Sequence, residues 1–236
     1  MSVNRRTHRS SHARRPSNPG PRPHRTQAER RVQTRQALLD AALELIDEGE
    51  SFEALSLRSV AKAAGIVPTA FYRHFASMDE LGLALVEDSF RTLRAMLRQA
   101  REGGLPPQHL IQRSVAILVE QVRTHRRQYM FIARVRSSGN GVLRHAVRTE
   151  IRLIISELAT DLARFPVLRE WTTEDLQMLA GVLVNTMIAI VESIIELPAA
   201  ERDGPADAGA LADITRIAEK QLLLPLLAVP QWRSVA

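Results

Sequence analysis

The stretch LSLRSVAKAAGIVPTAFYRHF, residues 55–75, decides the fold of this chain. Ser56 can cap a helix over residues 57–64, and Gly65 supplies the left-handed turn that ends it. Pro68 fits the first position of a second helix that runs to His74, because a proline there loses no helical hydrogen bond. Two short helices joined by a glycine turn predict a helix-turn-helix, although any compact helical hairpin has the same spacing.

The flanking sequence predicts helices throughout. An apolar pattern with helical spacing indicates a helix over 27–48, and Ser77 with Glu80 forms a capping box for a long helix over 78–101. Further helices are predicted near residues 106–124, 127–136, 141–164, 173–197 and 208–227, and no segment alternates as a strand. We therefore expect an all-α fold in which an N-terminal three-helix bundle with the helix-turn-helix is joined by the long helix to a second helical domain.

The positive charge is concentrated at the N-terminus. The chain has a formal net charge of +6, and seven arginines precede the first acidic residue, Glu29. Residues 1–26 also contain four prolines and no apolar periodicity, which predicts a disordered basic arm. Such an arm can follow a DNA backbone or enter a minor groove, or it can serve only as a solubilising tail, and both readings stay open. Its prolines argue against the amphipathic helix of an organelle transit peptide.

Several function classes are disfavoured by composition. The chain contains no cysteine, which excludes thiolate zinc fingers, and it lacks the HExxH, GxSxG, Walker and GxGxxG motifs. We therefore expect neither an enzyme nor a resident cofactor or metal. The start of the chain does not look like a secretion signal, and the apolar run Met178–Val191 is shorter than the roughly 20 residues of a membrane span. We interpret that run as a buried helix in a cytoplasmic protein without a membrane partner.

The motif residues resemble those of a known family. The segments Leu55–Ala61, Ala64–Ile66, Phe71–Phe75 and Asp79–Leu81 are similar to the DNA-binding signature of the TetR family of bacterial transcriptional regulators. The resemblance covers residues 33–93 as the DNA-binding domain. It implies that residues 94–229 form a helical domain that dimerises and binds a ligand, with double-stranded operator DNA as partner.

The resemblance also suggests which residues touch DNA. Tyr72 and His74 match positions that usually contact phosphates, and Thr69, Ala70 and Arg73 match positions that meet phosphates or base edges. At the start of the preceding helix, two more residues can donate to phosphate, Ser56 and Arg58. The alternatives are that His74 caps or packs locally and that Arg58 is a solvated surface arginine.

Two positions depart from the commonest family pattern. Val67 stands where a Ser or Thr usually caps the recognition helix, and Met78 stands where a phosphate-binding lysine is frequent. Pro68 compensates in part for the first departure, whereas the second puts one phosphate contact in doubt. We expect Phe71 and Phe75 to be core residues, because their spacing places them on one helical face.

The regulatory half carries a more detailed resemblance. Residues 64–75 and 134–139 look like the FabR and DesT regulators of unsaturated fatty acid synthesis, which respond to long-chain acyl thioesters. This likeness implies an apolar tunnel for an acyl-CoA-type effector, with candidate lining residues Leu183, Met187 and Val191. Arg134 and Arg136 are candidates for the anionic headgroup, unless they are merely exposed arginines at a helix end.

The likeness further implies a homodimer in which the helices near 173–197 and 208–227 pair with their copies. The sequence and these resemblances together predict a repressor that is controlled by a small hydrophobic ligand and acts in lipid metabolism. A regulator of an efflux or catabolic gene with an unrelated inducer is the alternative. A nonspecific nucleic-acid-coating protein, bound through the basic arm, is the rival from a different class.

Overall fold

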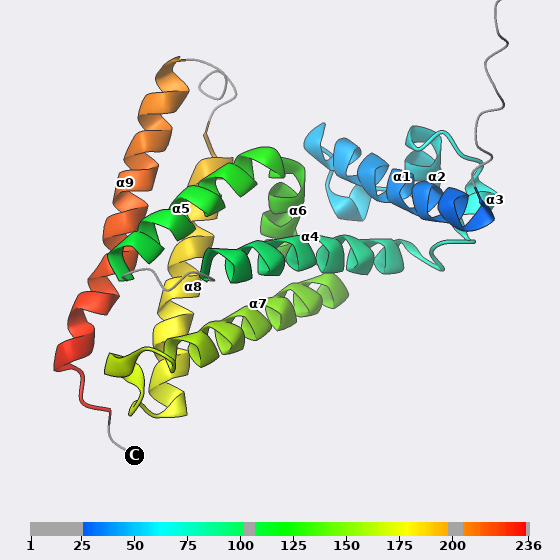
Figure 1. The fold of residues 1–236 in the computed structure, drawn as a ribbon. Coiled ribbons are helices and arrows are strands. Elements are labelled where there is room, and N and C mark those ends of the chain that lie inside the picture. The colour runs from blue at the N-terminus through cyan, green and yellow to red at the C-terminus, as the bar shows by residue number, and fades with distance from the viewer. Residues whose placement is uncertain (1–25, 102–106, 198–204, 235–236) are drawn as a thin grey trace, which may run out of the picture.

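The computed structural model describes residues 26–101, 107–197 and 205–234, and every regular element in these ranges is helical. The predicted all-α fold is confirmed (Figure 1). The α-helices are α1 (Gln27–Asp47), α2 (Leu57–Ala63), α3 (Pro68–Phe71), α4 (Met78–Arg101), α5 (Pro107–Thr124), α6 (Arg126–Ser137), α7 (Gly141–Leu162), α8 (Thr173–Ile195) and α9 (Pro205–Ala228). Short 3-10 turns are η1 (Phe52–Ala54), η2 (Pro166–Leu168) and η4 (Val229–Gln231). The predicted arm, except Thr26, lies outside the described residues.

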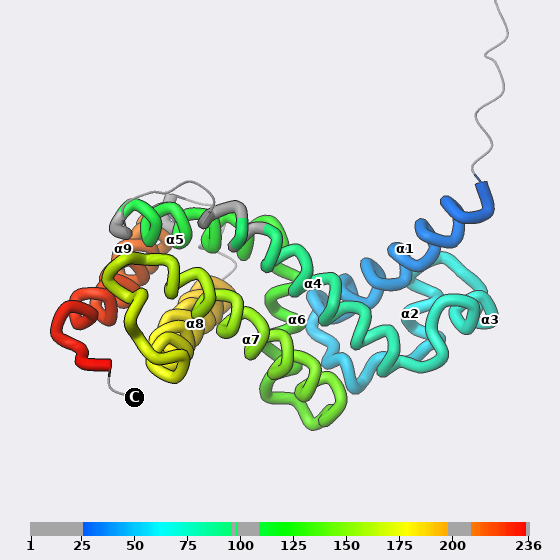
Figure 2. The backbone as a smooth tube through the Cα atoms, turned by 60° about the horizontal axis from the view of Figure 1, so that its bottom comes forward, coloured from blue at the N-terminus to red at the C-terminus, as the bar shows by residue number. Residues whose placement is uncertain are grey.

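Helices α1 to α3 gather at one end of the molecule, and α4 leads from them to the remaining helices (Figures 1 and 2). We call α1 to α3 with the start of α4 the N-terminal group. Its core contains Phe71 at 0% and Phe75 at 2% exposure, with ring centroids 5.7 Å apart. They share one buried cluster with Val60 and Leu81, so the prediction that both phenylalanines are core residues is confirmed.

Local signals set most helix ends in this group. The Ser56 hydroxyl accepts a hydrogen bond from the Ser59 N–H at 3.0 Å, so the predicted cap of α2 is confirmed. Gly65 follows α2 with a φ of +69°, the left-handed turn that the sequence indicated. Helix α3 ends at Phe71, earlier than predicted, and residues 72–74 form a turn. Val67 gives α3 no side-chain cap, so only Pro68 favours its start.

The predicted capping box of α4 is only half formed. The Ser77 hydroxyl accepts from the N–H of Glu80 at 3.1 Å, as expected. The Glu80 carboxylate, however, accepts from the N–H of Ala76 rather than from that of Ser77. The sequence spacing identified both polar side chains, but the turn before α4 presents a different amide to the carboxylate.

The remaining helices form what we call the C-terminal group, in which α8 lies between α7 and α9 and also contacts α5 and α6. Its core is apolar, with Leu118, Val122, Leu176, Ala180 and Leu222 all buried. The N-terminal core continues into this group, because Phe52 packs on Phe131 of α6 at 5.7 Å between ring centroids. The two groups are therefore joined by packed side chains as well as by α4.

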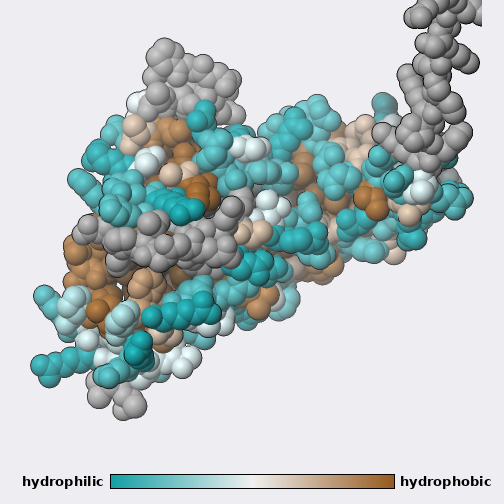
Figure 3. Space-filling model, in the orientation of Figure 1, coloured by the Kyte–Doolittle hydropathy of each residue, from teal (hydrophilic) through white to brown (hydrophobic). Residues whose placement is uncertain are grey.

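Helix α8 is 23 residues long and apolar enough to cross a membrane by length and composition, with 33% of its most apolar window buried. Core helices of globular proteins meet the same criteria, and α8 contacts four other helices. One stripe of α8 nevertheless stays exposed, including Met178 at 47% and Val182 at 45%. Apolar surface also lies along the end of α9 (Figure 3), where Leu224 and Leu227 are exposed.

Candidate DNA interface and ligand cavity

The helix-turn-helix presents its predicted DNA contacts at the surface. Ser56 and Arg58 at the start of α2 are exposed, as are Thr69 of α3 and Tyr72 in the following turn. Tyr72 is 64% exposed, and its ring meets that of Phe71 edge-on at 6.0 Å, so the buried phenylalanine fixes the tyrosine from below. The exposed phenol hydroxyl can therefore donate to a phosphate without leaving the packed position of its ring.

The other recognition residues differ in accessibility. Arg73 is exposed, Ala70 is half-buried, and Ser56 uses its hydroxyl in the cap of α2. Arg58 forms no ion pair within the described part of the chain, which leaves its guanidinium free to meet an anion. A buried Phe71 beneath these residues gives them a rigid base, as side chains that read DNA require.

His74 has a distinct environment. Its Nδ1 is buried and has no hydrogen-bond partner among the described residues. Burial lowers the pKa of His74 below its ordinary 6.5, and the positive charges of Arg31, Arg35 and Arg73 lower it further. The imidazole is therefore neutral at neutral pH. Arg31 and Arg35 were missed by the sequence reasoning, although their spacing of four residues on α1 placed them on one helix face.

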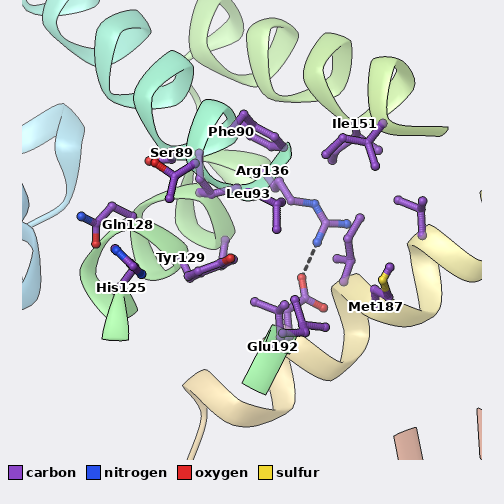
Figure 4. Close-up of a pocket in the computed structure, with 18 of the residues that line it drawn as sticks. Ser89, Phe90, Leu93, His125, Gln128, Tyr129, Arg136, Ile151, Met187 and Glu192 are labelled. Atoms are coloured by element: carbon purple, nitrogen blue, oxygen red, sulfur yellow. Dashed lines mark hydrogen bonds and ion pairs between the residues drawn. The ribbon is translucent and has the colours of Figure 1, made fainter. Parts of the chain in front are cut away.

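An apolar cavity of about 110 Å³ lies among α4, α6, α7 and α8 (Figure 4). Three of the predicted ligand residues, Met187, Val191 and Arg136, line it. A second cavity of about 190 Å³ is lined by Leu183, the fourth predicted residue, and by side chains of α5, α7 and α9. Ile154, Val184 and Met187 line both cavities and thus form the wall between them. The two cavities are therefore adjacent apolar spaces that share three lining side chains.

The first cavity carries a few polar groups. Nη1 of Arg136 lies 2.5 Å from Oε1 of Glu192, an ion pair between α6 and α8 that Figure 4 shows as a dashed line. Burial raises the pKa of Tyr129 to about 12, so its hydroxyl remains a protonated donor. His125 lines the same cavity, and its buried Nδ1 lacks a hydrogen-bond partner among the described residues. These groups can orient a ligand whose bulk is apolar.

The structure places Arg134 away from both cavities. Its Nη1 donates to the carbonyl oxygens of Ile46, at 2.7 Å, and Glu50, at 3.3 Å, at the end of α1. Ile46 lies in the last turn of α1, where its carbonyl also accepts from the N–H of Gly49 at 3.1 Å, and a cation at this end interacts favourably with the helix dipole. Arg134 therefore fastens α6 to α1, and the only predicted headgroup arginine at the cavity is Arg136.

Two further arginines of α6 reach the same end of α1. Nε of Arg127 lies 3.2 Å from Oδ2 of Asp47, and Nη1 of Arg126 lies 3.6 Å from Oδ1 of the same carboxylate. Arg126 also donates to the carbonyl oxygen of Ile195, at the end of α8, at 2.8 Å. Helix α6 thus lines the cavity and also holds α1 of the N-terminal group.

An exposed helix-turn-helix joined to a helical domain with an apolar cavity is the arrangement expected of a DNA-binding regulator. Two family models match this chain: residues 38–85 match "Bacterial regulatory proteins, tetR family", and residues 107–214 match "Tetracyclin repressor-like, C-terminal domain". The chain belongs to the TetR family of transcriptional regulators.

Solved structures with the same fold have low sequence identity to this chain. A TetR-like transcriptional regulator from Rhodococcus sp. RHA1 is 20% identical, with a TM-score of 0.60 over 82% of this chain and 96% of that one. FadR from Bacillus subtilis in complex with stearoyl-CoA is 13% identical, with a TM-score of 0.61 over 80% and 96%. SmeT in complex with triclosan is 21% identical, with a TM-score of 0.62 over 83% and 91%.

Proposed function

We propose that this protein is a cytoplasmic, non-enzymatic repressor that binds an operator duplex as a homodimer and is released or recruited by a small hydrophobic ligand. The observation that carries the proposal is the combination of exposed recognition side chains on a packed helix-turn-helix with an apolar cavity in the adjoining helical group. A regulator needs both a surface that reads DNA and a site whose occupancy changes that surface.

The proposed DNA contacts divide by chemistry. Tyr72 and Thr69 donate hydroxyl hydrogens to phosphates, which position the protein on the duplex without reading sequence. Arg73 presents two parallel donors that suit guanine, and the small Ala70 allows close approach to a base edge or a thymine methyl group. Arg58 and Ser56 add contacts at the start of α2, and His74 donates from the turn after α3.

Apolar surface that one chain leaves uncovered supports the proposed homodimer. Met178 and Val182 on α8 and Ile217, Leu224 and Leu227 on α9 are all at least 45% exposed. Apolar side chains grouped in this way on neighbouring helices are typical of a protein interface. Pairing α8 and α9 with their copies buries them in a four-helix contact and places two recognition elements for two related half-sites.

The ligand that we favour is a long-chain acyl thioester. Two adjacent cavities that share the flexible side chain of Met187 and two neighbours in their lining would together accommodate a long apolar chain if Met187 moves aside. A protein of the same fold, FadR from Bacillus subtilis, was solved with stearoyl-CoA. An acyl headgroup would meet Arg136 only after that guanidinium separates from Glu192.

The charges around the first cavity support the alternative ligand class. Its lining contains the carboxylates of Asp88 and Glu192 against the single guanidinium of Arg136. This balance disfavours a bare anion and favours an uncharged apolar inducer, as expected for an efflux or catabolic regulator. SmeT, solved with triclosan, has the same fold.

One experiment tests the function and separates these ligands. The wild-type protein selects operators from random duplexes, and its affinity for the selected duplex is then measured with and without oleoyl-CoA. We expect selection of two-fold related half-sites and at least a tenfold change of affinity with the thioester, which corresponds to about 1.4 kcal/mol of coupling. Met187→Trp, which fills the wall between the cavities, should abolish the response and keep ligand-free DNA binding.

Val142→Trp, at a position on α7 that is 50% exposed, is the matched control and should respond like wild type. If the protein enriches no sequence from the random duplexes, the proposed function as a DNA-binding regulator is rejected. Enrichment without an oleoyl-CoA response would reject only the acyl thioester and leave the uncharged inducer.

A further inference from the structure

Helix α1 has two oppositely charged halves. Residues 27–37 carry Arg30, Arg31 and Arg35 and one carboxylate, that of Glu29, which caps the backbone of Thr26. The second half is acidic and ends at Asp47, where the arginines of α6 bind. The basic half lies toward α3 (Figure 1), and the guanidinium carbon of Arg35 is 5.2 Å from the centroid of the Phe75 ring.

Three arginines lie close enough to His74 for their charges to lower its pKa, and one of them, Arg35, packs on the ring of the next residue, Phe75. Arg31 and Arg35 are exposed on successive turns of α1, and Arg73 is exposed next to His74 in the chain. Their charges all act on the imidazole of His74. Within the described residues none of the three arginines forms an ion pair with a carboxylate. The cluster thus consists of hydrogen-bond donors and positive charge without an acceptor.

A solvated helix face does not account for this cluster well. Three exposed arginines elsewhere pair with a carboxylate three or four residues earlier in the chain: Arg91 with Glu87, Arg164 with Asp161 and Arg216 with Asp213. Others, such as Arg58, form no ion pair within the described residues but do not lie beside two further arginines and a buried imidazole. Around His74 the positive charges repel one another instead, and the buried Nδ1 has no partner. An anion bound among the three guanidinium groups would relieve that repulsion.

We propose that Arg31 and Arg35 of α1 form, with Arg73 and His74, a phosphate-binding site that extends the DNA interface beyond the helix-turn-helix. This inference rests on the proposed DNA-binding function. The occupant is a backbone phosphate of the operator, because the cluster continues the exposed recognition surface at Arg73. The seven arginines that precede Glu29 in the sequence would add to the attraction for the same polyanion.

The test measures how salt affects DNA binding by the double variant Arg31→Gln/Arg35→Gln. Affinities are determined by fluorescence anisotropy from about 50 to about 200 mM NaCl, with the selected operator and with an unrelated duplex. Arg113→Gln/Arg169→Gln removes the same charge from two exposed positions in α5 and after η2. Arg35→Lys preserves the charge beside Phe75 and shows whether any loss reflects folding, which thermal melting also monitors.

Compared with wild type, the double variant should bind each duplex more weakly, by about tenfold for each of the two substitutions. The slope of log affinity against log salt concentration should become less steep by about 1.8, the amount expected for the loss of two phosphate contacts. The ratio of specific to nonspecific affinity should not change. The control should keep the wild-type slope, and Arg35→Lys should retain most of it. Equal slopes for the double variant and its control overturn this inference alone. A wild-type protein that binds neither duplex rejects the proposed function as well.

Discussion

The N-terminal and C-terminal groups bury their apolar side chains in different ways. In the N-terminal group the side chains of Leu38, Val60 and Phe71 are all 0% exposed, and the recognition residues sit directly on this packing. The C-terminal group is larger, yet it contains two cavities and leaves apolar stripes of α8 and α9 exposed. The first group is tightly packed beneath its exposed face, whereas the second has unfilled internal volume and uncovered apolar surface.

The proposed function accounts for this difference. Recognition of a duplex requires side chains held in one geometry, so the space beneath them is filled. Recognition of an apolar ligand requires space that is left free in one state and occupied in another. Substitutions should therefore have larger effects on folding in the N-terminal group than at the cavity walls.

The largest expected effect is that of Phe71→Ala. Removing a fully buried phenylalanine should cost about 3–5 kcal/mol of unfolding free energy, because the helix-turn-helix has little freedom to collapse around the void. Met187→Ala should cost less than about 2 kcal/mol, below the range for a fully packed methionine, since Met187 already borders two cavities. Urea unfolding followed by circular dichroism gives both values, and equal losses would contradict the contrast between the groups.

An intermediate effect is expected where the two groups meet, at Gly82 of α4. A Cβ atom on Gly82 would lie 2.7 Å from side-chain atoms of both Leu143 and Phe52, which are themselves buried. Gly82→Ala should therefore destabilise the protein by about 1–3 kcal/mol by forcing α4 away from α7.

Gly209→Ala in α9 is the matched control for this glycine. Among the described residues, no atom outside the adjoining backbone of α9 lies within 4 Å of a Cβ placed there, so alanine should stabilise the helix by about 0.5–1 kcal/mol. Thermal melts of the two variants should move in opposite directions. A neutral or stabilising Gly82→Ala would show that the junction is looser than the buried contacts indicate.

The smallest effect concerns pH and the N-terminal group. The pKa of His74 is lowered in the folded protein by burial and by the neighbouring arginines, so folding favours the neutral imidazole. Its contribution to stability is present above the ordinary pKa of 6.5 and declines as the pH falls through 6.5 toward the lowered value. The difference in melting temperature between wild type and His74→Gln, measured between about pH 8 and about pH 5.5, should shrink or reverse accordingly. A difference that stays constant would show that His74 titrates normally.

Much of the architecture could be predicted from local sequence signals. Ser56, Gly65 and Pro68 act through their own backbone geometry or nearest neighbours, so their roles in α2 and α3 are readable without a structure. The apolar spacing that predicted Phe71 and Phe75 as core residues works in the same way. The end of α3 was misjudged, because residues 72–74 are as compatible with a helix as with the turn that tertiary packing selects.

Contacts between residues far apart in the sequence could not be predicted from local patterns. Arg134 was a headgroup candidate because it stands near a Ser-Ser-Gly turn, but its partners lie 84 and 88 residues earlier in the chain. The clustering of Arg31 and Arg35 around His74 likewise depends on how α1 crosses α3. The cavities depend on the volume left between six helices, α4 to α9, which no single helix encodes. Arg136, Leu183, Met187 and Val191 do line them, although whether they bind a ligand stays a prediction.

Under the proposed function, helix α6 determines which bound ligands change the affinity for DNA. One of its faces lines the first cavity with Tyr129 and Arg136, and another holds the end of α1 through Arg134. Under the proposed function, a ligand that binds two orientations of α6 equally leaves DNA affinity unchanged, however tightly it binds. Only a ligand that favours an orientation in which Arg134 leaves the carbonyls of Ile46 and Glu50 would change how α6 holds α1. Occupancy of the cavity and the change in DNA affinity are then separate quantities, and a ligand can bind tightly without a response.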